Sequence, residues 1–202
     1  MDAPSQAKLQ EMWDHHEIRQ LLATYCHGCD RADEVEMAST YAAQSWDDHG
    51  PRKMDGRQFS IETVAESAET TRVVSHLLGQ SLIRVSGNEA GSETYFQATV
   101  IYPGRDSGPD TLNHLGGRYV DTLLREAGGW RIAKRVCVRE WSISHALERD
   151  WLAGRGFVEA RRDGADESYA ALGLAHSGNP WLGQVGGDWR TNPAGSAQAN
   201  RS

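Results

Sequence analysis

The chain has 202 residues and a formal net charge of −7 at pH 7, with a sequence pI of about 5.6 and no block of like charges. This acidic balance argues against nucleic acid and anionic membrane surfaces as partners. No apolar run approaches the roughly 20 residues of a membrane span, and the polar N-terminus lacks the apolar core of a signal peptide. We therefore expect a soluble, cytoplasmic protein with one domain over residues 1–145 and an extension over 146–202.

The first predicted element is a long helix from Pro4 to about Asp30, either continuous or broken near Asp14. One buried face is indicated by residues at helical spacing: Ile18, Leu21, Leu22, Tyr25, Cys26 and Cys29. Asp30 follows at the edge of that face, where a carboxylate is costly unless it is paired or hydrogen-bonded. We expect His76 to be its partner.

Two further helices are predicted before the first long strand. A short helix over residues 34–42 is followed by a short strand over 45–51, which ends at the Gly50-Pro51 turn. Apolar residues at helical spacing then predict a third helix over 56–72.

Four long strands are predicted next, over residues 73–86, 93–102, 112–126 and 130–145. Gly128 and Gly129 lie in a compact turn between the last two strands, which indicates a hairpin. Helices followed by hairpin-linked strands favour an α+β fold, with three N-terminal helices packed on one face of a mainly antiparallel sheet.

The extension has a weaker pattern. Residues 146–171 are helical only in pieces, whereas 176–202 are rich in Gly, Asn, Pro and Ser, and the last dozen residues are expected to be disordered. Trp181 and Trp189 indicate that the part before them docks on its own domain or on a neighbouring subunit.

The cysteines and one aspartate–histidine pair raise the question of a metal site. Cys26 and Cys29 form a C-x-x-C pair, but both lie on the apolar helix face and no second pair completes a zinc site, so we interpret them as core residues. Asp47 and His49 are two residues apart on a predicted strand and share a face, which makes them a weaker metal candidate. We expect no metal and no cofactor.

Asp30 and His76 suit acid–base catalysis. An imidazole works as a base when a carboxylate holds one ring nitrogen, fixes the tautomer and stabilises the cation. Taken singly, Asp30 is also explained as a cap of the next helix, and His76 as a packed histidine. Taken together they favour a catalytic pair, in which His76 is the base and Asp30 orients it.

Four short motifs between Gln10 and Ser144 resemble the SnoaL-like branch of the nuclear transport factor 2-like superfamily. They are Ile18-Arg19-Gln20-Leu21-Leu22-x-x-Tyr25 with Asp30, Ser75-His76, Gly117-Arg118-Tyr119-Val120-Asp121 and Gly129-Trp130-Arg131-Ile132-Ala133. The resemblance implies a cone-shaped α+β barrel, in which a strongly curved sheet surrounds a deep apolar pocket. It also implies a homodimer, and we expect this chain to form a homodimer or a homotrimer.

The resemblance further implies a chemistry. Members with an Asp on the first helix and a His on the following strand are cofactor-independent lyases and isomerases, such as scytalone dehydratase, bile-acid dehydratases and a dehydrochlorinase. Tyr25, Asp30 and His76 match the Tyr, Asp and His of the bile-acid dehydratases, and Tyr25 would bond a leaving hydroxyl or an oxyanion. The chain departs from scytalone dehydratase at residues 97–101, where it has no histidine.

Seven tryptophans and six tyrosines indicate an aromatic-lined cavity for a small hydrophobic or aromatic substrate, although they are also explained as core and interface residues. The predicted substrate contacts are Arg118, Tyr119, Arg139, Trp46, Trp141 and Tyr95. Arg118 or Arg139 would anchor a phenolate or a carbonyl. His114 also lies on a late strand, and alternation alone does not decide which of these residues point inward.

The sequence therefore predicts a cofactor-independent lyase that acts on an aromatic or polycyclic alcohol. Dehydration and retro-aldol-type deformylation of a lignin-derived diaryl diol are both consistent with it, and a double-bond isomerase would use the same pair. The alternatives without catalysis are a scaffold, similar to the β-subunit of a ring-hydroxylating dioxygenase, and a protein whose pocket only shapes its ligand.

Overall fold

The structure is a computed structural model that describes residues 3–105, 108–147 and 150–176. Its elements in chain order are α1 (Gln6–Arg31), α2 (Glu34–Ser39), β1 (Tyr41–His49), β2 (Arg52–Met54), α3 (Gly56–Thr70), β3 (Val73–Ser86), β4 (Glu89–Tyr102), β5 (Asp110–Glu126), β6 (Gly129–Leu147) and α4 (Glu167–Leu172). None of the helices in these ranges is long and apolar enough to cross a membrane.

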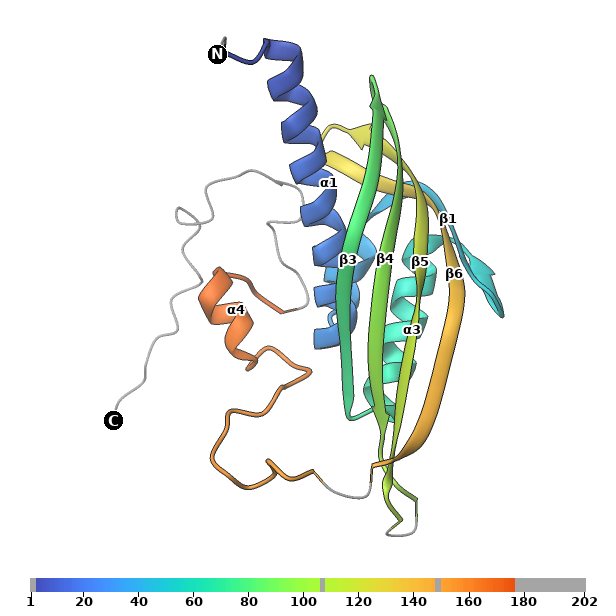
Figure 1. Ribbon diagram of the computed structural model, residues 1–202, viewed down its shortest axis with the longest axis vertical. Coiled ribbons are helices and arrows are strands. Elements are labelled where there is room, and N and C mark those ends of the chain that lie inside the picture. Colours follow the sequence, from blue (N-terminus) through green and yellow to red (C-terminus); the bar gives the residue numbers. More distant parts are fainter. Residues whose placement is uncertain (1–2, 106–107, 148–149, 177–202) are drawn as a thin grey trace.

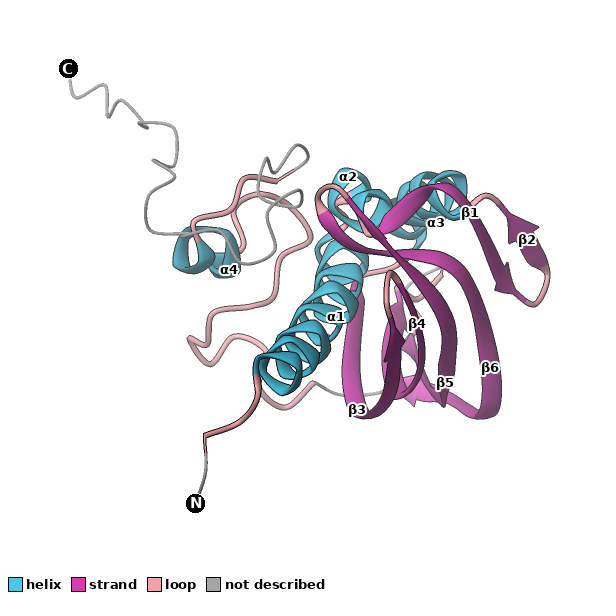
Figure 2. Cartoon of the chain, turned by 90° about the horizontal axis from the view of Figure 1, so that it is seen from above, coloured by secondary structure: helices cyan, strands magenta, loops and turns pink. Residues whose placement is uncertain are grey.

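The strands form one curved sheet in the order β2-β1-β6-β5-β4-β3, which confirms the predicted α+β class. The pairs are antiparallel except for β1 with β6, which is parallel. Figure 2 shows the sheet bending around the helices without closing, so that β2 and β3 remain its edges. The structure is therefore an open cone rather than a closed barrel.

β1 begins earlier than the sequence predicted. The second helix was expected to reach residue 42, but α2 ends at Ser39 and the chain enters the sheet at Tyr41. The Thr40 hydroxyl donates to the Met37 carbonyl, while the Thr40 carbonyl accepts from the Ile132 amide of β6. Pairing with β6 therefore replaces the last expected helical turn, and a nine-residue strand stands between α2 and α3.

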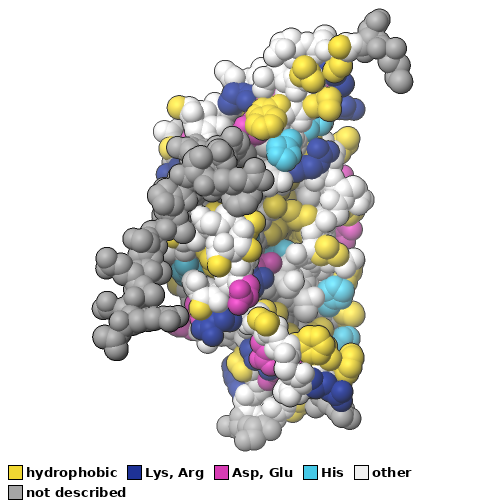
Figure 3. All heavy atoms as spheres, turned by 90° about the vertical axis from the view of Figure 1, so that its left-hand side faces the viewer, with side chains coloured by type: hydrophobic (Ala, Val, Ile, Leu, Met, Phe, Trp, Pro, Cys, Tyr) yellow, Lys and Arg dark blue, Asp and Glu magenta, His cyan; other side chains and the backbone are white. Residues whose placement is uncertain are grey.

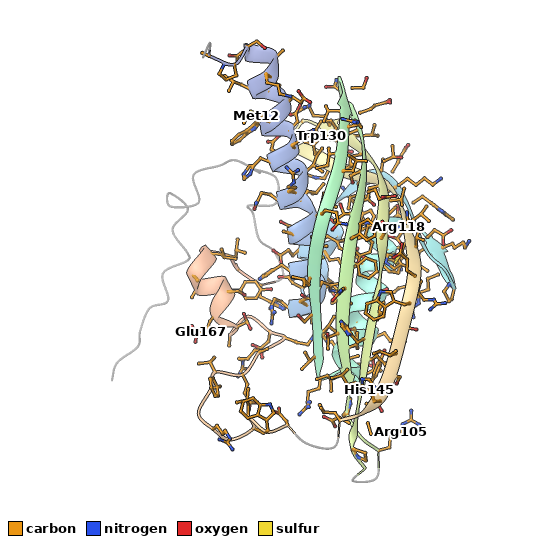
Figure 4. The ribbon with its side chains drawn as sticks, viewed as in Figure 1. Met12, Arg105, Arg118, Trp130, His145 and Glu167 are labelled. Atoms are coloured by element: carbon orange, nitrogen blue, oxygen red, sulfur yellow. The ribbon has the colours of Figure 1, made fainter. Side chains whose placement is uncertain are left out.

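α1 is one continuous helix (Figure 1). Ser5 caps its N-terminus by accepting from the Lys8 amide, and Ala32 ends it in the left-handed conformation. The alternative of a break near Asp14 is wrong, because the helix continues through this residue. The buried carboxylate of Asp14 accepts hydrogen bonds from Gln10 and Arg125. Trp130, which supplies a third donor, lies beside the upper half of α1 in Figure 4.

The core lies between the concave face of the sheet and the helices α1 and α3. Its largest fully buried apolar side chains come from six different elements: Ile18, Leu22, Met37, Tyr41, Val64, Leu123, Trp130 and Ile132. The helices reach down only one face of the strands, as Figures 1 and 2 both show. The helices therefore cover the concave face of the sheet, and a cavity lies between this face and the helices.

The described part of the extension packs against α1 on the side away from the sheet (Figures 1 and 2). Tyr169 is buried and donates to Asp33 at 3.1 Å, and Arg31 forms an ion pair with Asp166 at 3.2 Å. The pieces of helix predicted over 146–171 amount to one short helix, α4. Trp181, Trp189 and the expected disorder of the last dozen residues lie outside the described residues.

Candidate active site

A cavity of about 370 Å³ opens between α1, α3 and the concave face of the sheet. Most of its lining is apolar or aromatic, and α3 supplies the largest group of its polar side chains. Its residues are Tyr25, Cys29, Met37, His49, Arg52, Phe59, Thr63, Glu66, Ser67, Thr70, Thr71, Val74, His76, Phe96, Ala98, Val100, Tyr102, Leu115, Tyr119 and Cys137. A cavity of this size and lining suits a small ring compound.

Asp30 and His76 meet at one wall of the cavity, as the sequence predicted. Asp30 lies in the last turn of α1 and is only 7% exposed, and its Oδ1 is 2.6 Å from His76 Nδ1. Its Oδ2 accepts from the backbone amide of His76 at 2.9 Å. Both carboxylate oxygens thus hold one residue of β3, which fixes the imidazole in position.

This geometry leaves Nε2 of His76 available for proton transfer. No hydrogen bond to Nε2 is found among the residues that the structure describes, while Nδ1 is committed to Asp30. A carboxylate at Nδ1 favours the tautomer with the proton on that nitrogen, so a neutral ring presents a lone pair at Nε2. The arrangement can accept a proton and stabilise the resulting cation.

Tyr25 lies on the buried face of α1 and lines the cavity. Its ring makes edge contacts with Tyr41 and Tyr119, at centroid distances of 6.0 Å and 5.7 Å. Burial raises the pKa of Tyr25 well above its ordinary value, although Arg135 acts in the opposite direction. The phenol therefore stays protonated and can donate a hydrogen bond at any physiological pH.

A buried ion pair that the sequence reasoning did not single out holds these tyrosines. Arg135 on β6 donates two hydrogen bonds of 2.8 Å to Asp121 on β5. Its guanidinium lies 4.1 Å from the ring centroids of both Tyr25 and Tyr119. The period of two along β5 places Asp121 on the same face as Tyr119, which is the signal that could have found it.

Asp47 and His49 form a second carboxylate–imidazole pair in the cavity. Oδ1 of Asp47 is hydrogen-bonded to His49 Nδ1, and Oδ2 accepts from the Tyr41 hydroxyl. His49 stacks on Phe59 with 4.3 Å between centroids. The spacing of these two residues correctly predicted that they share a face, although it indicated only a weak metal candidate.

Among the predicted substrate contacts, Tyr119 lines the cavity and five residues do not. Arg118 is engaged by Glu93 and Glu140, each at 2.8 Å, on the opposite face of the sheet, and Figure 4 marks its place on β5. The other four are at least partly exposed outside the cavity: Arg139, Trp46, Trp141 and Tyr95.

The physical reason is the alternation of β-strand side chains. Arg118 and Tyr119 are neighbours on β5, so they point to opposite faces. Tyr95 and Trp141 line a separate hollow of about 270 Å³ on the outer face, and His114 contacts Trp141 rather than the cavity. A role for the five outer residues in binding a substrate inside the cavity is therefore not supported by their placement.

One set of side chains in the described residues could hold a metal ion. Possible ligand atoms of Cys29, Asp30 and His76 lie within 4.8 Å of one another. Nδ1 of His76 is already hydrogen-bonded to Asp30, so a metal ion bound at that nitrogen would displace this bond. Burial raises the pKa of the Cys29 thiol to about 12, which disfavours the thiolate that a metal requires.

The extension supports the cavity wall through Arg162. Its guanidinium donates to the carbonyls of Cys29 and Asp30, at 3.1 Å and 3.2 Å, at the C-terminus of α1. It also donates to the carbonyl and hydroxyl of Ser67 on α3, at 2.9 Å and 2.7 Å. A single side chain thus ties the end of α1, which carries Asp30, to the helix on the other side of the cavity.

The sequence profile of the SnoaL-like domain matches residues 10–136. The chain belongs to the SnoaL-like family. Its curved sheet and N-terminal helices give it the cone fold of the nuclear transport factor 2-like superfamily, of which the SnoaL-like proteins are a branch. The sequence matches no curated protein at a significant level.

Solved structures share the fold of this SnoaL-like chain. A proposed scytalone dehydratase from Novosphingobium aromaticivorans has 22% identity and a TM-score of 0.58, over 74% of this chain and 97% of that one. A proposed aromatic ring hydroxylase from the same organism has 17% identity and a TM-score of 0.59, over 71% and 96%. A hexachlorocyclohexane dehydrochlorinase from Novosphingobium barchaimii has 15% identity and a TM-score of 0.59, over 75% and 99%.

Proposed function

We propose that this SnoaL-like protein is a cofactor-independent lyase that acts on a hydrophobic aromatic or polycyclic alcohol. The observation that carries the proposal is the Asp30–His76 pair, which is nearly buried, fixed by two hydrogen bonds and open to an aromatic cavity. The names of two structural neighbours, a dehydratase and a dehydrochlorinase, support the class because both describe eliminations.

The groups in the cavity supply the steps of an elimination. Nε2 of His76 takes a proton from the substrate, and Asp30 stabilises the imidazolium that forms. The electron pair of the broken bond moves into the substrate and expels a leaving group from the neighbouring carbon. The Tyr25 hydroxyl donates a hydrogen bond to the oxygen on which negative charge develops.

Two alcohols fit this scheme. In a β-hydroxy carbonyl compound, His76 removes a carbon-bound proton, the electron pair expels the hydroxyl group from the neighbouring carbon, and that group takes up a proton to leave as water. In a lignin-derived diarylpropane-1,3-diol, His76 removes the proton of the primary hydroxyl and the carbon–carbon bond breaks to release formaldehyde. The electron pair of that bond forms the double bond of a stilbene and expels the other hydroxyl, which takes up a proton to leave as water. Both routes convert the substrate into a conjugated product.

A double-bond isomerase would use the same base and return the proton to another carbon. A scaffold subunit has no need of a buried carboxylate–imidazole pair, so this geometry favours catalysis. We propose that the assembly is a homodimer or homotrimer, since the outer face of the sheet exposes large apolar side chains: Leu77, Leu82, Trp141 and Ile143. Static light scattering on the purified protein tests the assembly.

The function is tested by an ultraviolet scan of the purified protein with aromatic β-hydroxy ketones and 1,2-diarylpropane-1,3-diols. We expect a conjugated absorption to develop with the wild type and to fall by about 100-fold or more in His76→Gln and Asp30→Asn. His114→Gln, which changes a histidine outside the cavity, serves as the matched control and should retain activity. Equal activity in all four proteins would contradict the proposal.

A further inference from the structure

The cavity contains two imidazoles, and each is held in the same way. Nδ1 of His76 bonds Asp30, and Nδ1 of His49 bonds Asp47. Both rings line the same cavity, and the described residues offer no hydrogen bond to Nε2 of either. The second pair comes from the end of β1 and therefore approaches the cavity from a different element than β3.

The His49 pair is built to be rigid. Asp47 is 0% exposed, and both of its oxygens are occupied, one by His49 and the other by the Tyr41 hydroxyl. The Tyr41 ring in turn lies against Gly56, where an added Cβ would come within 2.1 Å of a ring carbon. Phe59 stacks on the imidazole from α3. His49 is therefore held at Nδ1 by Asp47 and on its ring face by Phe59.

The surrounding charges leave Asp47 as the immediate partner of a protonated His49. Arg52 and Glu66, which line the cavity beside it, are paired with each other. Arg135 is paired with Asp121 at 2.8 Å. An imidazolium at His49 therefore has a buried carboxylate at Nδ1 and can deliver its other proton from Nε2 into the cavity.

We propose that His49 is the general acid of this site and that Asp47 and Tyr41 are its positioning residues. This inference rests on the proposed function. His76 removes a proton from the substrate, the electron pair expels the hydroxyl group, and His49 Nε2 gives that oxygen a proton so that it leaves as water. At the end of the reaction His76 is cationic and His49 neutral, and a proton returned through solvent restores the starting state.

The second pair indicates a class of leaving group. Hydroxide is a poor leaving group and gains from protonation, whereas chloride departs as a stable anion without it. The site is therefore suited to alcohols, and His49 should matter for the hydroxy compound much more than for a chloride of the same skeleton.

The test compares 4-hydroxy-4-phenylbutan-2-one with its 4-chloro analogue, and each rate is corrected for uncatalysed elimination. We expect His49→Gln to lower kcat/KM by about 100- to 10,000-fold for the alcohol and by less than about 5-fold for the chloride. Asp47→Asn should shift the same ratio in the same direction. His76→Gln should lower both rates, and His114→Gln neither.

The ratio of the two rates within one variant does not depend on the fraction of folded protein, so partial misfolding cannot imitate the result. Equal losses of kcat/KM with both substrates in His49→Gln, or no loss with either, would refute the role of His49 as general acid. The proposed lyase activity would remain intact. A wild-type protein that converts neither of these compounds, nor any member of the alcohol panel, would refute the lyase and the general acid together.

Discussion

The Asp121–Arg135 pair makes a quantitative prediction about stability. Arg135 is fully buried, receives two carboxylate contacts of 2.8 Å, and lies 4.1 Å from two tyrosine rings. Burial by itself lowers the pKa of an arginine, and the Asp121 carboxylate reverses this and holds the pKa of Arg135 above its ordinary value. Asp121→Ala would leave the guanidinium buried without its counter-ion.

Removing one partner of a buried pair costs about 3–5 kcal/mol, and we expect this loss in the free energy of unfolding of Asp121→Ala. For a chain of this size the loss corresponds to a fall in Tm of about 10 °C. The double variant Asp121→Leu/Arg135→Met should recover a large part of the loss, since apolar side chains leave no uncompensated charge.

Urea unfolding followed by circular dichroism measures these differences. Glu93→Gln, which removes one of two partners of the partly exposed Arg118, is the matched control and should change the free energy by less than about 1 kcal/mol. A loss below about 1 kcal/mol in Asp121→Ala, or a double variant less stable than the single one, would refute the assignment of this pair as a buried support of the cavity.

Three further predictions concern the end of α1 and the thiols. Ala32→Gly should raise the free energy of unfolding by about 0.5–1 kcal/mol because Ala32 has φ 54°; Ala38→Gly, inside α2, should lower it by a similar amount in the same urea titration. Arg162→Ala should cost about 1–3 kcal/mol through the lost bonds to helix carbonyls, and an unchanged urea midpoint would show that the extension does not support α1. Burial raises the pKa of Cys29 to about 12 and that of Cys137 to about 11, so the neutral thiols should react with iodoacetamide at pH 8 more slowly than free cysteine by at least about 100-fold. Mass spectrometry of alkylated protein reads this out, with denatured protein as control, and comparable rates would contradict the burial of the two thiols.

Long periodic elements could be predicted from the sequence. The apolar spacing from Ile18 to Cys29 predicts α1, and hydrophobic strands separated by turn residues predict β3 to β6. The cost of burying Asp30 at the edge of the core, together with the family resemblance, predicted its contact with His76 across 46 residues.

Alternation shows which residues share a face but not which face is concave. Arg118 and Tyr119 were therefore both expected in the cavity, although neighbours on a strand cannot both point into it. The face is decided by the curvature of the whole sheet and by the helices that cover one side, which no local window contains.

The second imidazole pair depends on long-range structure. β1 pairs in parallel with β6, and its register shifts between Tyr41 and Trp46, which is typical of a β-bulge. Tyr41 and Asp47 meet across this irregular stretch. The sequence shows that Asp47 and His49 share a face, but the strand register that brings them to the same cavity as His76 has no local signature.

The central claim is that Asp30 and His76 act as one acid–base unit in a cofactor-independent elimination. The most direct measurement is the rate of formation of the conjugated product by the wild type, Asp30→Asn, His76→Gln and the double variant. Each single change should lower kcat/KM by about 100-fold or more, and the double variant should be no worse than the poorer single, because residues that act as a unit are non-additive. Losses that multiply in the double variant, or a single variant with wild-type activity, would contradict the account.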